Sequence, residues 1–268
     1  MNNDNRDRLL GVLNEHRGLG ISEQIDFDKF YLYSLITHST AIEGSTVTEV
    51  EAQLLFDEGI TSGKRTMMEQ LMNLDLKAAY EYGMEWIMLH EPVTVDWLVS
   101  LAAKVMARTG SEYHSITGDF DASKGELRKL NVTAGPAGRS YMSYLKVPGK
   151  LREFCDELNR KRGTIDPSDV ASVYDLSFWA HYELVTIHPW ADGNGRTSRL
   201  LMNLIQMEYG VLPSIIYKED KAEYIQALVD SRDDDNVDAF IDFMARLHCC
   251  HLADDIARFE RNVSGLKR

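Results

Sequence analysis

Apolar positions recur every three or four residues along most of the chain, which is the spacing of amphipathic helices. Helix signals mark several of the ends: Thr48 and Glu51 have capping-box spacing, Pro167 precedes one apolar run, and Gly210 follows another. The pattern predicts eight helices, over residues 30–43, 46–56, 67–89, 95–108, 168–186, 196–209, 222–230 and 237–251.

One stretch, residues 125–148, departs from the helical pattern. Residues 127–133 partly alternate between apolar and polar positions, a Gly-Pro-Ala-Gly turn signal follows at 135–138, and residues 141–147 are aromatic and β-prone. This arrangement predicts a β-hairpin. The sequence therefore indicates an all-α fold with one small β-hairpin.

Composition narrows the class of protein. Of 268 residues, 44% are hydrophobic and 26% are charged, which suffices for an ordinary buried core. The net charge of −13 argues against nucleic acid as a main partner, because binding its backbone requires an extended basic surface, but it does not exclude a small local anion site. No apolar run is as long as a membrane span, no apolar signal-peptide core follows Met1, and three cysteines do not form a disulfide framework. We expect a cytoplasmic protein with no membrane partner.

The stretch HPWADGNGRTSR, residues 188–199, concentrates groups that suit a polyphosphate. A Gly-Asn-Gly turn lies directly before a predicted helix, where free N–H groups and the helix dipole attract anions. Arg196 and Arg199 are three residues apart and share a face at that helix end. Guanidinium groups bind phosphate oxygens in a bidentate manner. Together these features indicate a phosphate site.

Two further residues of this stretch could act on a bound nucleotide. Asp192 could hold Mg²⁺ shared with the phosphates. His188 is the nearest titrating group, and a neutral imidazole can accept a proton from a hydroxyl nucleophile. Each element alone is common in structural loops and solvated helix faces, whereas their combination at one helix start favours function.

The stretch resembles the signature of the Fic family, His-Pro-Phe-x-Asp/Glu-Gly-Asn-Gly-Arg-x-x-Arg, with Trp190 in place of the phenylalanine. The flanks, HYELVTI before the motif and TSRLLMNL from Thr197, also resemble the family, and the likeness runs from about Ile36 to Leu247. The resemblance implies a helical core with a hairpin flap and a protein that transfers AMP from ATP to a hydroxyl side chain of a target protein. Homodimers occur in the family.

The resemblance also implies a role for each residue of the motif. His188 would deprotonate a Ser, Thr or Tyr hydroxyl of the target, and Asp192 would bind Mg²⁺. The groups implied to hold the phosphates are the backbones of Gly193 and Gly195, the side chain of Asn194, Arg196 on the pyrophosphate side and Arg199 on the terminal phosphate.

The resemblance also implies binding roles for two other regions. The adenine would contact Tyr224 and Leu228, although a core aromatic–aliphatic pair is an equal alternative. The flap, residues 129–144, would pair with an extended segment of the target, although a purely structural hairpin remains open. By contrast, His-Cys-Cys-His at 248–251 has no second ligand pair at zinc spacing and is interpreted as packing.

A second motif lies upstream. Ser39 and Glu43 are four residues apart on one helix face, and Gly44 should end that helix. A carboxylate at a helix C-terminus opposes the dipole, which favours a tertiary partner for Glu43. The pattern resembles the inhibitory helix of the family, in which the glutamate binds the second arginine of the signature, here Arg199.

The resemblance predicts an autoinhibited protein adenylyltransferase that uses ATP and Mg²⁺. Two alternatives stay open, removal of AMP with Glu43 orienting water, and an ATP-binding regulatory module with negligible transfer. We expect an N-terminal helical region at 1–100 with the inhibitory motif, a core at 101–247 with the flap and catalytic loop, and a C-terminal helical tail at 248–268.

Overall fold

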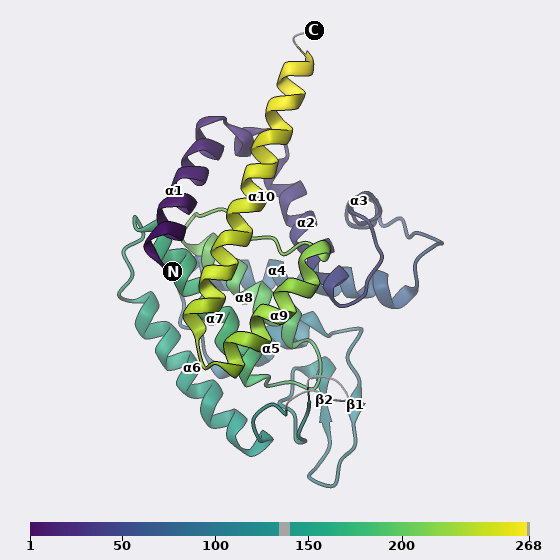
Figure 1. The fold of residues 1–268 in the computed structure, drawn as a ribbon. Helices are drawn as coiled ribbons and strands as arrows, with labels where there is room; N and C mark the ends of the chain where they lie inside the picture. The colour runs from purple at the N-terminus through teal and green to yellow at the C-terminus, as the bar shows by residue number, and fades with distance from the viewer. Residues whose placement is uncertain (134–139, 267–268) are drawn as a thin grey trace.

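The computed structural model describes residues 1–133 and 140–266, and 69% of the chain is helical (Figure 1). The helices are α1 (Asn3–Gly18), α2 (Phe27–Ile42), α3 (Glu49–Glu58), α4 (Met67–Met88), α5 (Val95–Val105), α6 (Val147–Arg162), α7 (Val170–Ile187), α8 (Asn194–Glu208), α9 (Lys221–Asp233) and α10 (Val237–Leu266). The all-α prediction is confirmed.

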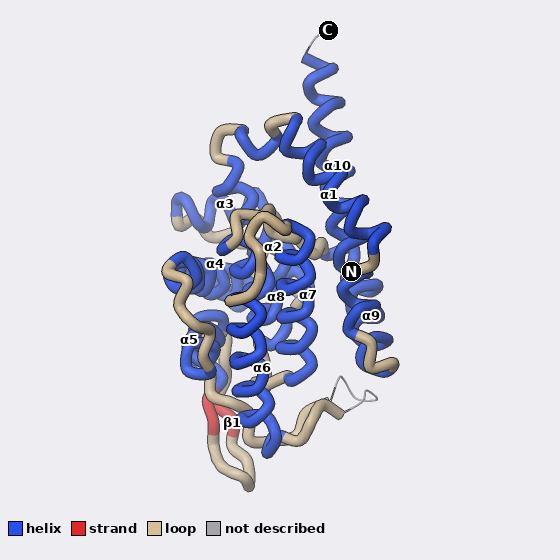
Figure 2. The backbone as a smooth tube through the Cα atoms, turned by 90° about the vertical axis from the view of Figure 1, so that its left-hand side faces the viewer, coloured by secondary structure: helices blue, strands red, loops and turns tan. Residues whose placement is uncertain are grey.

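Helices α7 and α8 form the centre of the fold and pack against each other along their length. Helices α4 and α5 pack on α8, α6 packs on α7, and α10 joins α1, α7 and α9 on another side (Figures 1 and 2). Every α8 residue from Arg196 to Gln206 is buried, because neighbours surround this helix. The short loop between α7 and α8 therefore lies in a rigid frame.

Local sequence explains several helix ends. The side chain of Thr48 accepts from the Glu51 N–H, and Glu51 bonds back to Thr48, so the predicted capping box is confirmed. Gly44 follows the end of α2 with φ of +105°, which glycine adopts without strain. Two helices were not predicted, α1 and α6.

The prediction of one small hairpin is confirmed, and its two strands lie upstream of the segment predicted for it. Strands β1 (Glu112–Tyr113) and β2 (Phe120–Asp121) pair antiparallel before the predicted segment begins. In the predicted flap, the described residues form one antiparallel bridge, Thr133 to Ser140, and its turn at 134–139 lies outside the described residues. The β-prone residues Tyr144–Lys146 form a 3₁₀ turn into α6, because Pro148 at the helix start favours helix over strand.

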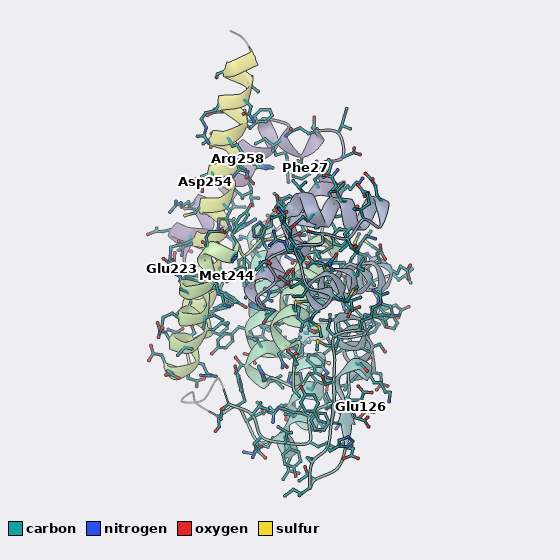
Figure 3. All side chains as sticks on the ribbon, turned by 90° about the vertical axis from the view of Figure 1, so that its right-hand side faces the viewer. Phe27, Glu126, Glu223, Met244, Asp254 and Arg258 are labelled. Atoms are coloured by element: carbon teal, nitrogen blue, oxygen red, sulfur yellow. The ribbon has the colours of Figure 1, made fainter. Side chains whose placement is uncertain are left out.

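Helix α10 runs along the body and then projects beyond it. Met244 lies in the half beside the other helices, whereas Asp254 and Arg258 lie toward the free end (Figure 3). His248 is buried against the Tyr174 hydroxyl at 3.1 Å, as the packing interpretation of residues 248–251 requires. Over the described ranges, no helix is long and apolar enough to cross a bilayer.

Candidate functional site

His188 is the residue at which α7 ends. It adopts the left-handed conformation, φ +51°, and its N–H donates to the Leu184 carbonyl at 3.1 Å. The imidazole Nδ1 lies 3.3 Å from the Val185 carbonyl oxygen. Since a carbonyl can only accept, this contact makes Nδ1 the donor and leaves the lone pair on Nε2.

The imidazole of His188 is stacked on the ring of Tyr141, with centroids 3.8 Å apart and 16° between the ring planes. The guanidinium of Arg232, on α9, lies over the Tyr141 ring at 5.3 Å from its centroid. Burial lowers the pKa of His188 to about 4, and the nearby cations Arg128 and Arg232 act in the same direction. His188 is therefore neutral at pH 7, as a general base must be.

Arg128, which no sequence pattern predicted, fixes the loop that holds His188. Its side chain is 2% exposed, and it donates to three backbone carbonyls: Nε to His188 at 2.8 Å, Nη1 to Leu130 at 2.8 Å and Nη2 to Met142 at 2.7 Å. Its own N–H donates to the Pro189 carbonyl at 3.0 Å. One guanidinium thus joins both limbs of the predicted flap to the candidate catalytic loop.

The turn before α8 is held by its own side chains. The Trp190 indole is buried and donates to the Gly125 carbonyl at 2.9 Å. The Asn194 amide accepts from the Trp190 N–H at 3.0 Å and donates to the Trp190 carbonyl at 2.9 Å. The amide of Asn194 therefore shapes the loop, and its contact with a phosphate stays a prediction. Gly193 has φ of +80°, and a Cβ there would lie 2.7 Å from the Met106 sulfur.

Arg196 carries unmet hydrogen-bonding capacity at the predicted anion site. It is 2% exposed, and its Nη2 contacts the Met106 sulfur at 3.0 Å and lies 3.5 Å from the Asp192 carboxylate. Its Nε and Nη1 are buried, with no hydrogen-bond partner among residues 1–133 and 140–266. Burial lowers the pKa of Arg196. A buried cation with unsatisfied donors fits an approaching anion.

Asp192 is the carboxylate predicted to bind Mg²⁺, and its surroundings fit a magnesium ion whose other ligands are water and nucleotide phosphates. The Asp192 side chain is 57% exposed, and one of its oxygens accepts from the Gly193 N–H at 2.6 Å. No cluster of three or more acidic, His or Cys side chains suited to a metal occurs in the described part of the chain. One exposed carboxylate suits Mg²⁺, which keeps several waters and binds substrate phosphates.

Arg199 joins α8 to the end of α2. Its Nε donates to Ser39 Oγ at 2.9 Å, and its Nη2 donates to the Ser39 carbonyl at 2.9 Å and to Glu43 Oε1 at 2.6 Å. Arg199 is 3% exposed, and the Glu43 side chain is 33% exposed. The structure thus brings together the two motifs that lie 156 residues apart in the sequence.

Gly195 provides the space in which this ion pair forms. A Cβ at Gly195 would lie 2.6 Å from Glu43 Oε1 and 2.9 Å from Arg199 Nη1, closer than atoms in contact can approach. The Glu43 carboxylate therefore lies directly over the backbone at the start of α8. This is the place where the sequence predicts the phosphates of a nucleotide.

The ion pair shifts the pKa of both partners. Burial alone would raise the pKa of Glu43, but the Arg199 charge and hydrogen bond outweigh it, so the pKa is lowered. Burial likewise disfavours the charged form of Arg199, and the Glu43 carboxylate outweighs it, so the pKa is raised. Both groups are charged at neutral pH.

A cavity of about 260 Å³ opens beside these groups. His188, Gly195, Arg199 and Glu43 line it together with one face of α9. That face comprises Lys221, Tyr224, Ile225, Leu228, Val229 and Arg232. The structure thus brings Tyr224 and Leu228 to the predicted nucleotide site, although Tyr224 is also a core residue whose hydroxyl lies 2.9 Å from His181 Nε2.

Lys221 and Arg232 were not predicted at this site. They stand three residues before Tyr224 and four after Leu228, so the helical spacing of the predicted pair extends to both. Their positive charges face a cavity that already contains Arg199. The site is therefore a local cationic pocket on a protein of net charge −13.

Comparison with known proteins agrees with this geometry. Residues 92–206 match the Fic/DOC family. Protein adenylyltransferase Fic of Drosophila erecta is 30% identical over 215 residues, which are 78% of this chain and 39% of that protein. Protein adenylyltransferase fic-1 of Caenorhabditis elegans is 29% identical over 208 residues, 75% of this chain and 36% of that protein. The chain spans less than half the length of these relatives.

Solved structures show the same fold. A Fic domain-containing signaling protein from Bacteroides thetaiotaomicron superposes with a TM-score of 0.74 at 21% identity, covering 93% of this chain and 96% of that one. Fic-1 from Caenorhabditis elegans gives 0.72 at 23% identity over 96% and 73% of the two chains. IbpAFic2 covalently tethered to Cdc42 gives 0.51 at 17% identity over 89% and 70%. The fold and site define a Fic-type helical protein. The chain belongs to the Fic/DOC family and is related to the Fic protein adenylyltransferases.

Proposed function

We propose that this protein is an autoinhibited protein adenylyltransferase, which transfers AMP from ATP to a Ser, Thr or Tyr hydroxyl of a target protein. The observation that carries the proposal is the Glu43 carboxylate, which lies over Gly195 and binds Arg199 at 2.6 Å beside His188. The curated relatives support the reaction class, since those named above are protein adenylyltransferases.

The reaction begins with the target hydroxyl near His188. Its oxygen attacks the α-phosphorus of ATP while its proton passes to Nε2, the nitrogen left free by the Nδ1 contact with Val185. A bond forms between the hydroxyl oxygen and the α-phosphorus, the bond from that phosphorus to the bridging oxygen breaks, and pyrophosphate leaves. Arg196 and Arg199 would neutralise the departing charge. Mg²⁺, when bound with the nucleotide at Asp192, would supply further charge neutralisation.

Autoinhibition follows from competition for one guanidinium. The terminal phosphate needs Arg199, and Glu43 is tethered to the same chain, so it competes at high effective concentration. The cavity of about 260 Å³ is below the roughly 300–1,000 Å³ usual for ligand sites. Withdrawal of the Glu43 side chain would free the space over Gly195 and the hydrogen bond of Arg199 to the Glu43 carboxylate, while the contacts of Arg199 with Ser39 would remain.

Target binding would use the flap, residues 129–144. Strand addition recognises backbone rather than side chains, which suits a range of target segments. Two observations support such a role. The antiparallel bridge at Thr133 and Ser140 pairs the two limbs of the flap, and the bonds of Arg128 connect both limbs to the His188 carbonyl. The tethering of IbpAFic2 to Cdc42 is an example of a protein target in this fold.

Labelled ATP tests the reaction. Glu43→Gly protein is incubated with a lysate of the native cells and either α-labelled or γ-labelled ATP, with the double variant Glu43→Gly/His188→Ala as the control. Protein-bound label should come from the α-labelled nucleotide alone and disappear in the control. Label from the γ position would indicate phosphoryl transfer, and nucleotide binding without label would indicate a regulatory module.

A second candidate is the removal of AMP from a modified protein. It is favoured by one observation, that Glu43 and His188 line the same cavity, where a partly exposed carboxylate could orient water. The two functions predict opposite effects of Glu43→Gly, since the substitution would raise AMP transfer but abolish AMP removal.

A further inference from the structure

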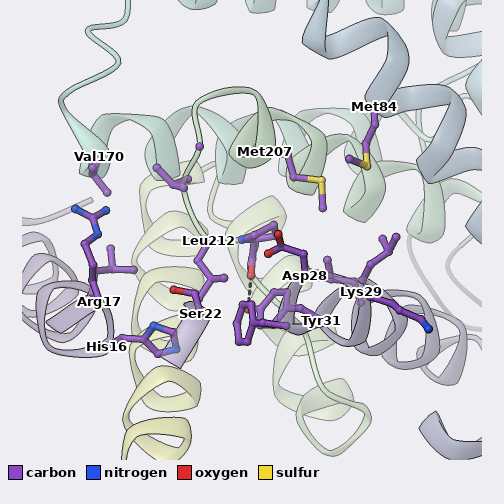
Figure 4. Close-up of a pocket in the computed structure, with 17 residues that line it drawn as sticks. His16, Arg17, Ser22, Asp28, Lys29, Tyr31, Met84, Val170, Met207 and Leu212 are labelled. Atoms are coloured by element: carbon purple, nitrogen blue, oxygen red, sulfur yellow. Dashed lines mark hydrogen bonds between the residues drawn. The ribbon is translucent and has the colours of Figure 1, made fainter. Parts of the chain in front are cut away.

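A mainly apolar cavity lies away from the predicted nucleotide site, at the first half of α2. Its volume is about 610 Å³, within the range of small-molecule sites. Figure 4 shows His16 and Arg17 at one end and Met84 and Lys29 at the other. Apolar side chains form most of the walls, and they include Leu13, Leu32, Leu35, Met207, Val211 and Leu212.

His16 is the buried polar group of this cavity. It is 4% exposed, and its Nε2 is buried with no hydrogen-bond partner among the described residues. Burial lowers the pKa of His16, so the ring is neutral at pH 7. A buried ring nitrogen without a partner costs free energy unless a ligand group or water binds it. By contrast, the Tyr31 hydroxyl in the same cavity already donates to the Pro213 carbonyl at 2.6 Å.

The polar groups at the rim do not select a strongly charged ligand. Arg17, Asp28 and Lys29 are all exposed there, and Lys29 is already paired with Asp57 at 2.7 Å. The rim thus carries charges of both signs, while the interior offers apolar surface and one ring nitrogen. This chemistry suits a neutral, mainly apolar molecule with a single hydrogen-bonding group such as a hydroxyl.

The cavity shares a helix with the inhibitory motif. One stripe of residues spaced four apart runs along α2 and ends at its C-cap: Tyr31, Leu35, Ser39 and Glu43. Tyr31 and Leu35 line the cavity, whereas Ser39 and Glu43 bind Arg199. The open cavity and the ion pair coexist in this structure. A ligand packed on Tyr31 and Leu35 therefore favours this position of α2 over any position that closes or reshapes the cavity.

We propose that this cavity binds a small, mainly apolar molecule with one hydrogen-bonding group, and that the bound molecule holds α2 where Glu43 reaches Arg199. The first part is independent of the function proposed above, and the second part rests on it. The polar group of the ligand bonds His16 Nε2, and its apolar body replaces water along α2 and α8.

Binding is tested with 1-naphthol as the probe and 1-methylnaphthalene, which lacks the hydroxyl, as its partner compound. Titration calorimetry should show one-to-one binding of 1-naphthol to the wild type, about fivefold tighter than 1-methylnaphthalene, the effect of one neutral hydrogen bond. His16→Phe keeps an aromatic ring against Phe27 and should remove that preference. Absence of binding, or equal affinities in the wild type, overturns the site without reliance on any variant.

Two tryptophan variants locate the probe. Leu32→Trp reduces the volume of the cavity and should weaken both compounds several-fold. Leu228→Trp, the matched change in the nucleotide cavity, should leave their affinities unchanged. The opposite pattern would place the probe in the nucleotide site and overturn the proposal.

Coupling is tested by self-labelling with α-labelled ATP. Saturating 1-naphthol should lower transfer by the wild type and leave transfer by Glu43→Gly unchanged, because that variant has no ion pair to stabilise. If Glu43→Gly is activated but 1-naphthol does not slow the wild type, the coupling is refuted and the proposed function stands. If Glu43→Gly is not activated, the proposed function fails, and the calorimetry still decides the site.

Discussion

Arg128→Lys should destabilise the protein and slow transfer although the positive charge is retained. The guanidinium spans three carbonyls on three segments, at 2.7 to 2.8 Å each. A lysine ammonium is a point donor that can reach about one of them from the same backbone position. Two hydrogen bonds to a charged group are then lost, each worth roughly 1.5–3 kcal/mol. We expect the free energy of unfolding to fall by about 3 kcal/mol or more.

The kinetic effect of this variant separates positioning from simple stability. Arg128 contacts the His188 carbonyl but does not line the cavity predicted to bind the nucleotide. In the Glu43→Gly background, Arg128→Lys should therefore lower kcat, on the order of 10²-fold for a misplaced base, with KM for ATP nearly unchanged. Arg160→Lys, at an exposed arginine paired with Glu157, is the control and should change neither quantity. An unchanged urea midpoint and unchanged kcat in Arg128→Lys would refute the positioning role.

Further predictions concern the base, the buried histidines and the aromatic anchor. His188→Ala should reduce transfer by at least 10²–10⁴-fold while calorimetry shows nearly unchanged ATP binding, and a wild-type rate would refute the role. Burial lowers the pKa of His181 and of His248 to about 3, so the unfolded chain binds protons below pH 6.5 that the folded chain does not. Stability should therefore fall as the pH drops below 6.5, by about 1.4 kcal/mol for each histidine at pH 5.5, and His248→Gln should reduce this dependence in urea titrations at pH 7 and 5.5. Trp190→Phe keeps an aromatic ring but loses the hydrogen bond to the Gly125 carbonyl, so the free energy of unfolding should fall by about 1–3 kcal/mol. An unchanged free energy of unfolding would mean that this bond contributes nothing.

Helices with a buried apolar stripe were predictable from the sequence. Helices α4, α5, α7 and α8 lie close to their predicted ranges, because buried positions recur with the helical period. Helix α1 was missed because most of its residues are polar and its buried positions include Asn5 and His16, which give no apolar periodicity. Helix α6 has the regular stripe Val147, Leu151, Phe154 and Leu158, but the preceding aromatic residues favoured a strand.

The candidate site likewise has parts that the sequence predicts and parts that only the fold reveals. The loop from His188 to Arg199 is local in sequence, so its composition alone indicated an anion site. The contact between Glu43 and Arg199 was expected from the resemblance, and local chemistry alone required only some partner for Glu43. Arg128 could not be predicted, because its function depends on three carbonyls brought together by the fold and not on its neighbours in the sequence.

The rate of self-labelling with α-labelled ATP, compared between the wild type and Glu43→Gly, tests the central claim most directly. If Glu43 withholds Arg199 from the terminal phosphate, Glu43→Gly should transfer AMP much faster than the wild type. Glu43→Asp should be intermediate, because its shorter side chain reaches Arg199 less well, and Glu43→Gly/Arg199→Ala should lose the gain. Equal rates and equal ATP affinities in the wild type and Glu43→Gly would contradict the account, and a slower Glu43→Gly would assign Glu43 a catalytic role instead.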